Sequence, residues 1–233
     1  MTIPVKDSSH NPVLVALDVP NAQSALALTQ RLRPFVGGFK VGLELFCAAG
    51  PAIVEDIGAA NVFLDLKFHD IPNTVAGAVR ATARLGVMML NVHCLGGSEM
   101  MRAAVEAGRA VNSEVKIIGV TILTSHDAAQ LRELGLDEEP AAAVRRLALM
   151  AREAGLDGVV CSPQEIQAVR AECGPDFLLV TPGVRPAGSA KGDQKRVLTP
   201  QQALADGADW LVIGRPITGA SDPAQAAQDI LKS

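Results

Sequence analysis

Charged residues of alternating sign follow or interrupt short apolar runs in the first third of the chain. They are Asp18, Lys40, Asp65, Lys67 and Asp70. Asp65 and Lys67 lie two positions apart, so in an extended strand both side chains point to the same face. Charges among apolar strands are costly unless paired, and a paired array of ammonium and carboxylate groups suits acid–base and electrostatic catalysis. The alternative is a solvated ring of ion pairs that only caps the structure.

A second group of residues, near the end of the chain, is typical of phosphate binding. The last apolar run, 210–215, ends in Gly214 and Arg215. Gly214 has no side chain to keep a ligand from the backbone N–H, and Arg215 offers two parallel donors to phosphate oxygens. The Gly- and Pro-containing segment 184–196 predicts a mobile loop, although an ordinary surface loop has the same composition. Together these features favour a phosphorylated substrate.

The elements that must position these residues alternate between two types. Stretches of helical periodicity, such as 22–32 and 141–155, separate apolar runs typical of strands buried on both faces. This alternation predicts an α/β fold, a single-domain (β/α)8 TIM barrel with its catalytic residues at the carboxyl ends of the strands. A doubly wound open sheet is the rival, but ALDVPN at 16–21 stands where its glycine-rich turn would be. The eight expected strands cover residues 13–19, 38–43, 61–68, 87–94, 116–123, 158–162, 177–184 and 210–215.

Composition limits the class of protein. Apolar residues make up 48% of the 233 residues and the net charge is −4, which argues against a nucleic-acid binder or a membrane-surface binder. No apolar stretch approaches the roughly 20 residues of a membrane-spanning helix, and no apolar signal core begins the chain, so we expect a cytoplasmic protein. We expect residues 1–12 to form a polar lead-in and residues 13–233 the barrel. Cysteine and histidine spacings predict buried free thiols and no protein-built metal site.

The run LDLKFHDIPNT at 64–74 resembles the signature of the orotidine 5′-monophosphate decarboxylase family, in its bacterial branch. Further motifs that resemble this family follow in the same order and at spacings that suit a barrel. The resemblance covers nearly the whole chain. These motifs are VALD at 15–18, KVGLELF at 40–46, NVH at 91–93, LTS at 123–125, DGVVCS at 157–162, VTPGVRP at 180–186, GDQKR at 192–196 and VIGRPI at 212–217.

The resemblance implies that orotidine 5′-monophosphate loses its C6 carboxylate as CO₂ and becomes uridine 5′-monophosphate, the last step of de novo UMP synthesis. It implies no cofactor: no metal, flavin, pyridoxal or thiamine. Lys67 would donate the proton to C6, and Asp65 would lie near the departing carboxylate and keep Lys67 charged. Lys40 would join this charged network. The resemblance also implies a homodimer in which Asp70 reaches the site of the other subunit.

The remaining binding residues come from the same resemblance. Asp18 and Lys40 match a ribose-side pair, Asp70 and Thr74 match ribose contacts from the partner subunit, and Thr124 matches a hydroxyl near the pyrimidine. Gln194 would bridge phosphate and base, and Arg185, Gly214 and Arg215 would surround the phosphate. The whole signature segment is expected to bind substrate, namely Asp65, Leu66, Lys67, Phe68, His69, Asp70, Ile71, Pro72, Asn73 and Thr74. His69 and His93 are expected to be structural rather than acid–base groups.

Two other functions remain open from the sequence. One is a metal-dependent sugar-phosphate decarboxylase, a related barrel that shares the Asp-x-Lys pair on the third strand and stabilises an enediolate with a divalent metal. The context KFHDIPNT at 67–74 and the position of Lys40 argue against it. The other is a non-catalytic barrel that senses a phosphorylated metabolite. The complete set of Asp65, Lys67 and Asp70 argues against a decayed site.

Overall fold

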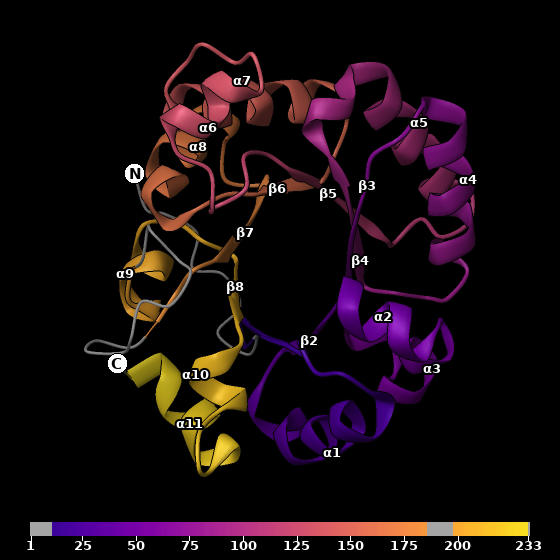
Figure 1. Ribbon diagram of the computed structural model, residues 1–233, viewed down its shortest axis with the longest axis vertical. Helices are drawn as coiled ribbons and strands as arrows, with labels where there is room; N and C mark the ends of the chain where they lie inside the picture. The colour runs from indigo at the N-terminus through magenta and orange to yellow at the C-terminus, as the bar shows by residue number, and fades with distance from the viewer. Residues whose placement is uncertain (1–10, 186–197, 233) are drawn as a thin grey trace.

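Eight parallel strands close into a barrel in the order β1 to β8, and the helices surround this ring (Figure 1). The computed structural model describes residues 11–185 and 198–232. The predicted (β/α)8 barrel is therefore confirmed, and the open sheet is excluded because β1 pairs with both β2 and β8. No helix in these described ranges has the length and apolar character needed to cross a bilayer.

Every expected apolar run contains a strand, and most strands end before the run does. The first two strands are buried throughout and the third over its first three residues, as continuous apolar runs predict. Polar residues after the strand ends, such as Asp18, are then free to project over the barrel mouth. The strands are β1 (Val13–Ala16), β2 (Gly38–Gly42), β3 (Val62–Phe68), β4 (Met89–His93), β5 (Lys116–Val120), β6 (Gly158–Val160), β7 (Leu178–Pro182) and β8 (Trp210–Ile213).

The described chain holds eleven α-helices, more than one for each strand. The predicted helix 22–32 has these same bounds, and Asn21 caps it by accepting the N–H of Ser24. The predicted helix 141–155 runs from Pro140 to Glu153. The helices are α1 (Ala22–Leu32), α2 (Leu43–Ala49), α3 (Ala52–Ile57), α4 (Pro72–Ala83), α5 (Gly97–Arg109), α6 (Ala128–Glu133), α7 (Pro140–Glu153), α8 (Ile166–Cys173), α9 (Pro200–Ala205), α10 (Arg215–Thr218) and α11 (Pro223–Asp229).

Apolar side chains fill the inside of the barrel as well as the layer between strands and helices. Successive residues of a strand point to opposite faces, so Val13 and Val15 pack in the outer layer and Leu14 points inward. The inner cluster draws on six strands and consists of Leu14, Phe63, Met89, Ile118, Val180 and Trp210. The barrel is therefore a packed core, and a ligand can enter only at its mouth.

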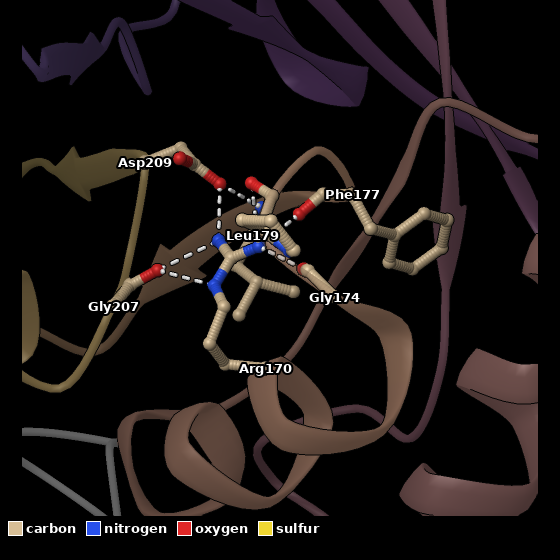
Figure 2. Close-up of polar contacts among 7 residues, drawn as sticks. Arg170, Gly174, Phe177, Leu179, Gly207 and Asp209 are labelled. Carbon is tan, nitrogen blue, oxygen red and sulfur yellow. Dashed lines mark hydrogen bonds and ion pairs between the residues drawn. The ribbon is translucent and has the colours of Figure 1, made fainter. Parts of the chain in front are cut away.

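The amino ends of β7 and β8 are tied together by one arginine of α8 (Figure 2). The guanidinium of Arg170 donates to the carbonyls of Gly174, Phe177 and Gly207 at 2.6–3.2 Å. It also donates to Asp209 Oδ2 at 2.7 Å. The same carboxylate oxygen accepts the N–H of Leu179, the second residue of β7, at 2.7 Å. This cluster is bonded mainly to backbone groups, and it links the amino ends of β7 and β8.

The start of the chain and the cysteines were also the subject of sequence expectations. Residues 1–10 of the expected lead-in lie outside the described residues, whereas Asn11 donates to the carbonyl of Phe35 and Pro12 accepts the N–H of Leu211. Of the four cysteines, three are buried and Cys47 is exposed. The expectation that all four thiols are buried was therefore wrong for Cys47, which lies on the short surface helix α2.

Candidate active site

Four charged side chains from three neighbouring strands form one row at the carboxyl end of the barrel. Lys40 Nζ lies 2.9 Å from Asp18 Oδ1 and 3.4 Å from Asp65 Oδ2. Lys67 Nζ lies 2.6 Å from Asp65 Oδ1. Parallel pairing of β1, β2 and β3 brings these strand ends together, as the sequence predicted.

The backbone at Lys67 departs from a regular strand. The pairing of β3 with β4 shifts register between Leu64 and Phe68, and Lys67 has a φ of +51°. Simple alternation of side chains therefore does not hold through this segment, although it was the reason given for bringing Asp65 and Lys67 together. The two side chains do meet, but they are brought together by an irregular strand in which the Lys67 backbone has the left-handed conformation.

Opposite charges keep Asp65 ionised. Burial on its own would raise the pKa of this carboxyl group. The nearby ammonium groups of Lys40 and Lys67, with hydrogen bonds from Lys67 and Asn91, outweigh burial and hold the pKa below its ordinary value of 3.8. At neutral pH the site therefore presents a partly buried carboxylate between two ammonium groups.

The charged row forms one wall of a cavity of about 280 Å³. Polar groups from other strand ends also line the cavity, including the hydroxyl-bearing Thr124 after β5 and Arg215 at the start of α10, which follows the β8 strand paired with β1. Among the predicted site residues, those that line this cavity are Asp18, Lys40, Asp65, Lys67, Thr124, Arg185, Gly214 and Arg215. Its apolar lining includes Phe63, Val120, Ile122, Leu123, Val160, Pro182, Val184 and Val212. Positive and negative groups in one largely apolar lining can hold a small anionic molecule.

The rest of the signature segment lies outside this cavity. Leu66 and Phe68 pack against the core. Asn73 and Thr74 are exposed on the first turn of α4. A separate surface hollow is lined by His69, Asp70, Ile71, Pro72, Leu95 and Gly96. Within its own chain, the predicted segment is therefore divided between the cavity and an outer surface.

The expected phosphate loop is described only at its two ends. Val184 pairs with Leu198, and the N–H of Arg185 donates to the carbonyl of Leu198 at 3.0 Å. Gln194 and the expected mobility of the loop lie outside the described residues. The two described ends meet beside the cavity, because Val184 and Arg185 both line it.

Two polar residues of β4 were not among the predicted substrate-binding or catalytic residues, although the structure places them beside the charged row. Asn91 is fully buried and bonds to both Asp65 and the backbone of Lys67. His93 stacks on His69 with ring centroids 5.3 Å apart. Burial, followed by the charges of His69, Lys67 and His126, lowers the pKa of His93 to about 4. The signal that could have found Asn91 is an amide side chain inside the apolar run 87–94.

No cluster of three or more potential metal-ligating His, Cys, Asp or Glu side chains occurs among the described residues.

Comparisons with known proteins agree on one family. The family described as "Orotidine 5'-phosphate decarboxylase / HUMPS family" matches residues 11–230. The Orotidine 5'-phosphate decarboxylase of Moorella thermoacetica is 56% identical over 234 residues, covering 97% of this chain and 93% of that protein. The one from Halorhodospira halophila is 57% identical over 220 residues, covering 94% and 93%. A crystal structure of Orotidine 5'-phosphate decarboxylase from Lactobacillus acidophilus superposes with a TM-score of 0.82 at 41% identity, covering 95% of this chain and 98% of that one.

Proposed function

The chain belongs to the Orotidine 5'-phosphate decarboxylase / HUMPS family, and we propose that it converts orotidine 5′-monophosphate into uridine 5′-monophosphate and CO₂ without a cofactor. The observation that carries the proposal is the row Asp18, Lys40, Asp65 and Lys67 in one cavity, with Arg215 on another part of its wall. The same proposal includes the last step of de novo UMP synthesis and a cytoplasmic location.

The reaction needs a fixed positive charge and a proton at one carbon. When the bond from C6 to the carboxylate breaks, the electron pair stays on C6 in the plane of the ring, where the ring carbonyls do not delocalise it. An ammonium group held beside C6 stabilises this charge and can protonate it. Lys67 supplies that group: an Nζ proton moves to C6, and the neutral amine takes a proton back from water.

Asp65 has two roles in this proposal. Its carboxylate holds the Lys67 ammonium in place through an ion pair of 2.6 Å. Its lowered pKa keeps it negative beside the place proposed for the substrate carboxylate. Loss of CO₂ removes the like charge next to Asp65, so the interaction is more favourable after bond breaking than before.

The rest of the cavity is proposed to hold the ribose, base and phosphate. Asp18 and Lys40 form a pair that suits ribose hydroxyls, and Thr124 offers a hydroxyl to the pyrimidine. Gly214 exposes its backbone and Arg215 its guanidinium to the phosphate, with Arg185 beside them. Gln194 completes the proposed set by bridging phosphate and base. Phosphate binding remote from C6 can then be used to raise the rate as well as the affinity.

The proposal includes a homodimer with shared sites. Asp70 is exposed and lines the outer hollow rather than the cavity that holds Lys67. Two large apolar side chains at that hollow are also exposed, Ile71 at 67% and Leu95 at 38%. A second copy packed there would cover them and could receive Asp70 and Thr74 in its own ribose site.

Mixed dimers test the shared site. Lys67→Ala and Asp70→Ala homodimers should each be nearly inactive. After refolding together, half the dimers are mixed, and each mixed dimer has one site with both substitutions and one with neither. Activity should therefore recover to about a quarter of wild type per total site, from the two-fold symmetry. Verified mixed dimers with no gain over their parents would show that Asp70 acts within its own chain.

The function itself is tested by the loss of orotidine 5′-monophosphate absorbance on addition of purified, EDTA-dialysed protein. We expect undiminished turnover. Activity that disappears with EDTA and returns with Mg²⁺ would instead select the metal-dependent sugar-phosphate decarboxylase. Binding of uridine 5′-monophosphate without any turnover of the substrate would select the non-catalytic barrel.

A further inference from the structure

One neutral side chain touches both members of the Asp65–Lys67 pair. Asn91 lies in the middle of β4 and is fully buried. Its Oδ1 accepts the backbone N–H of Lys67 at 2.7 Å, and its Nδ2 donates to Asp65 Oδ1 at 2.7 Å. An N–H can only donate and an ionised carboxylate can only accept, so one orientation of the amide satisfies both. Asn91 therefore links the backbone of the lysine to the carboxylate that holds its ammonium.

The backbone of Lys67 is irregular at the point where it meets Asn91. Between Leu64 and Phe68, β3 advances four residues while its pairing on β4 advances from Leu90 to Val92. The extra residues interrupt the regular ladder, and the amide oxygen of Asn91 takes the place of a strand partner for the Lys67 N–H. A lysine at φ +51° is uncommon, because its Cβ crowds the backbone there, and such a conformation persists only where its surroundings hold it.

We propose that Asn91 is a positioning residue for the decarboxylation proposed above, on which this inference rests. Through its carbonyl oxygen it fixes the backbone from which the Lys67 side chain extends. Through its NH₂ group it fixes the Asp65 oxygen to which Lys67 Nζ is bonded. Removing Asn91 leaves the ammonium in the cavity but no longer holds it at one place, and displacement by about 1 Å can cost two orders of magnitude in rate.

A purely structural role for Asn91 makes a different prediction, and Thr121 provides the matched control. Thr121 is also fully buried, just beyond the neighbouring strand β5, and its Oγ1 donates to the carbonyl of Val160 at 2.8 Å. It has no contact with Asp65 or Lys67 among the interactions of the described residues. Thr121→Val removes a buried hydrogen bond near the same end of the barrel without touching the charged row.

The first comparison is between Asn91→Leu and Thr121→Val. Asn91→Leu removes both hydrogen bonds at similar size, so kcat should fall about 100-fold while KM changes by no more than about threefold. Thr121→Val should keep kcat within about threefold of wild type at a comparable loss of stability. Equal kcat values for the two variants would overturn the proposal.

Asn91→Asp distinguishes the contributions of the two hydrogen bonds. It also tests the proposal if Asn91→Leu does not fold. An ionised carboxylate still accepts the Lys67 N–H but repels Asp65, whereas a protonated carboxyl has the same donor and acceptor pattern as the amide. The charged groups around this pair are Lys40 and Lys67, with Asp18 beyond Lys40 and His93 further along β4. The ratio of its kcat to that of wild type should therefore rise as the pH falls. A ratio that stays constant between pH 8 and the acid limit of the wild type would overturn the donor role.

Hydrogen exchange at the Lys67 amide distinguishes this inference from the proposed function. The Lys67 N–H should exchange slowly in wild type and faster in Asn91→Leu, with Thr121→Val like wild type. This holds whatever the protein catalyses. If wild type shows this protection but does not turn over orotidine 5′-monophosphate, the proposed function fails and the positioning contact stands. Equal exchange in all three proteins would overturn the contact itself.

Discussion

The two ends of the barrel each hold a charged cluster, and the clusters are bonded differently. At the amino end, all three guanidinium nitrogens of Arg170 donate hydrogen bonds, mostly to backbone carbonyls, and Asp209 accepts a backbone N–H (Figure 2). At the carboxyl end, the ammonium groups of Lys40 and Lys67 have carboxylates as their hydrogen-bonding partners among the described residues. Both lysines face a cavity.

We infer that this difference separates a structural use of charge from the catalytic use proposed above. The Arg170 cluster satisfies backbone groups at the starts of two strands, so its charged groups form their hydrogen bonds within the protein. The Lys67 cluster keeps N–H donors directed toward a space that a substrate can occupy. We therefore expect substitutions at the two ends to affect different quantities, turnover at one end and stability at the other.

Lys67→Ala should show the largest effect. It removes both the proton donor and the positive charge proposed to lie beside C6, so kcat should fall by more than the ~10²–10⁴ expected from acid–base catalysis alone. Binding of uridine 5′-monophosphate, measured by calorimetry, should weaken far less because the ribose and phosphate contacts remain. A variant that retains more than about a tenth of the wild-type kcat would remove Lys67 from the proton-transfer step.

Arg215→Ala should have the next largest effect, again on activity. Loss of a charge-assisted contact to phosphate should raise KM and lower kcat/KM by about 3 kcal/mol, on the order of a hundredfold. Added guanidinium ion should restore part of the activity. Arg31→Ala is the control, because Arg31 pairs at 3.5 Å with Asp222 on the outer surface. An unchanged KM with no rescue would exclude Arg215 from phosphate binding.

Arg170→Met should affect stability instead of turnover. The substitution leaves the Asp209 carboxylate, whose side chain is 4% exposed, without its guanidinium and frees several carbonyls. The unfolding free energy from denaturant titration should fall by about 3 kcal/mol, whereas kcat per folded molecule stays within about twofold. Arg145→Met, which removes an exposed pair with Glu172, should cost less than about 1 kcal/mol. A loss of kcat in folded Arg170→Met would contradict the claim that the amino-end charges affect stability and not turnover.

His93→Gln should have the smallest effect, confined to acid pH. Burial lowers the pKa of folded His93 to about 4, whereas an unfolded histidine binds its proton near pH 6.5. Between these values the unfolded state binds more protons, so this residue lowers stability as the pH falls from 6.5 to 4. His93→Gln should lower the number of protons taken up on unfolding in this pH range by about one, and it should change stability little at pH 7. An unchanged slope would show that His93 is not neutral in the folded protein.

The sequence was sufficient for the features that follow from regular strand pairing. Continuous apolar runs predicted all eight strands, and parallel pairing then predicted that Asp18, Lys40 and Asp65 meet. These predictions needed only the order and direction of the strands.

Features that depend on irregular backbone were not predictable in the same way. The register shift at Lys67 arises from how β3 packs on β4, and no local signal in the run 61–68 marks it. The role of Arg170 was missed because its partners are mostly carbonyl oxygens, which every residue has. Asn91 did carry a signal, a polar side chain in an apolar run, but its two partners come from another strand.

The unfolding free energy of Lys67→Ala, measured on the preparation used for turnover, tests the contrast between the two ends most directly. Asp65 keeps Lys40 and Asn91 as partners when Lys67 is removed, and the Lys67 side chain is 32% exposed. The unfolding free energy should therefore fall by no more than about 1 kcal/mol, while kcat falls by several orders of magnitude. A loss of about 3 kcal/mol, equal to that of Arg170→Met, would show that the carboxyl-end charges also hold the fold together and would contradict the account.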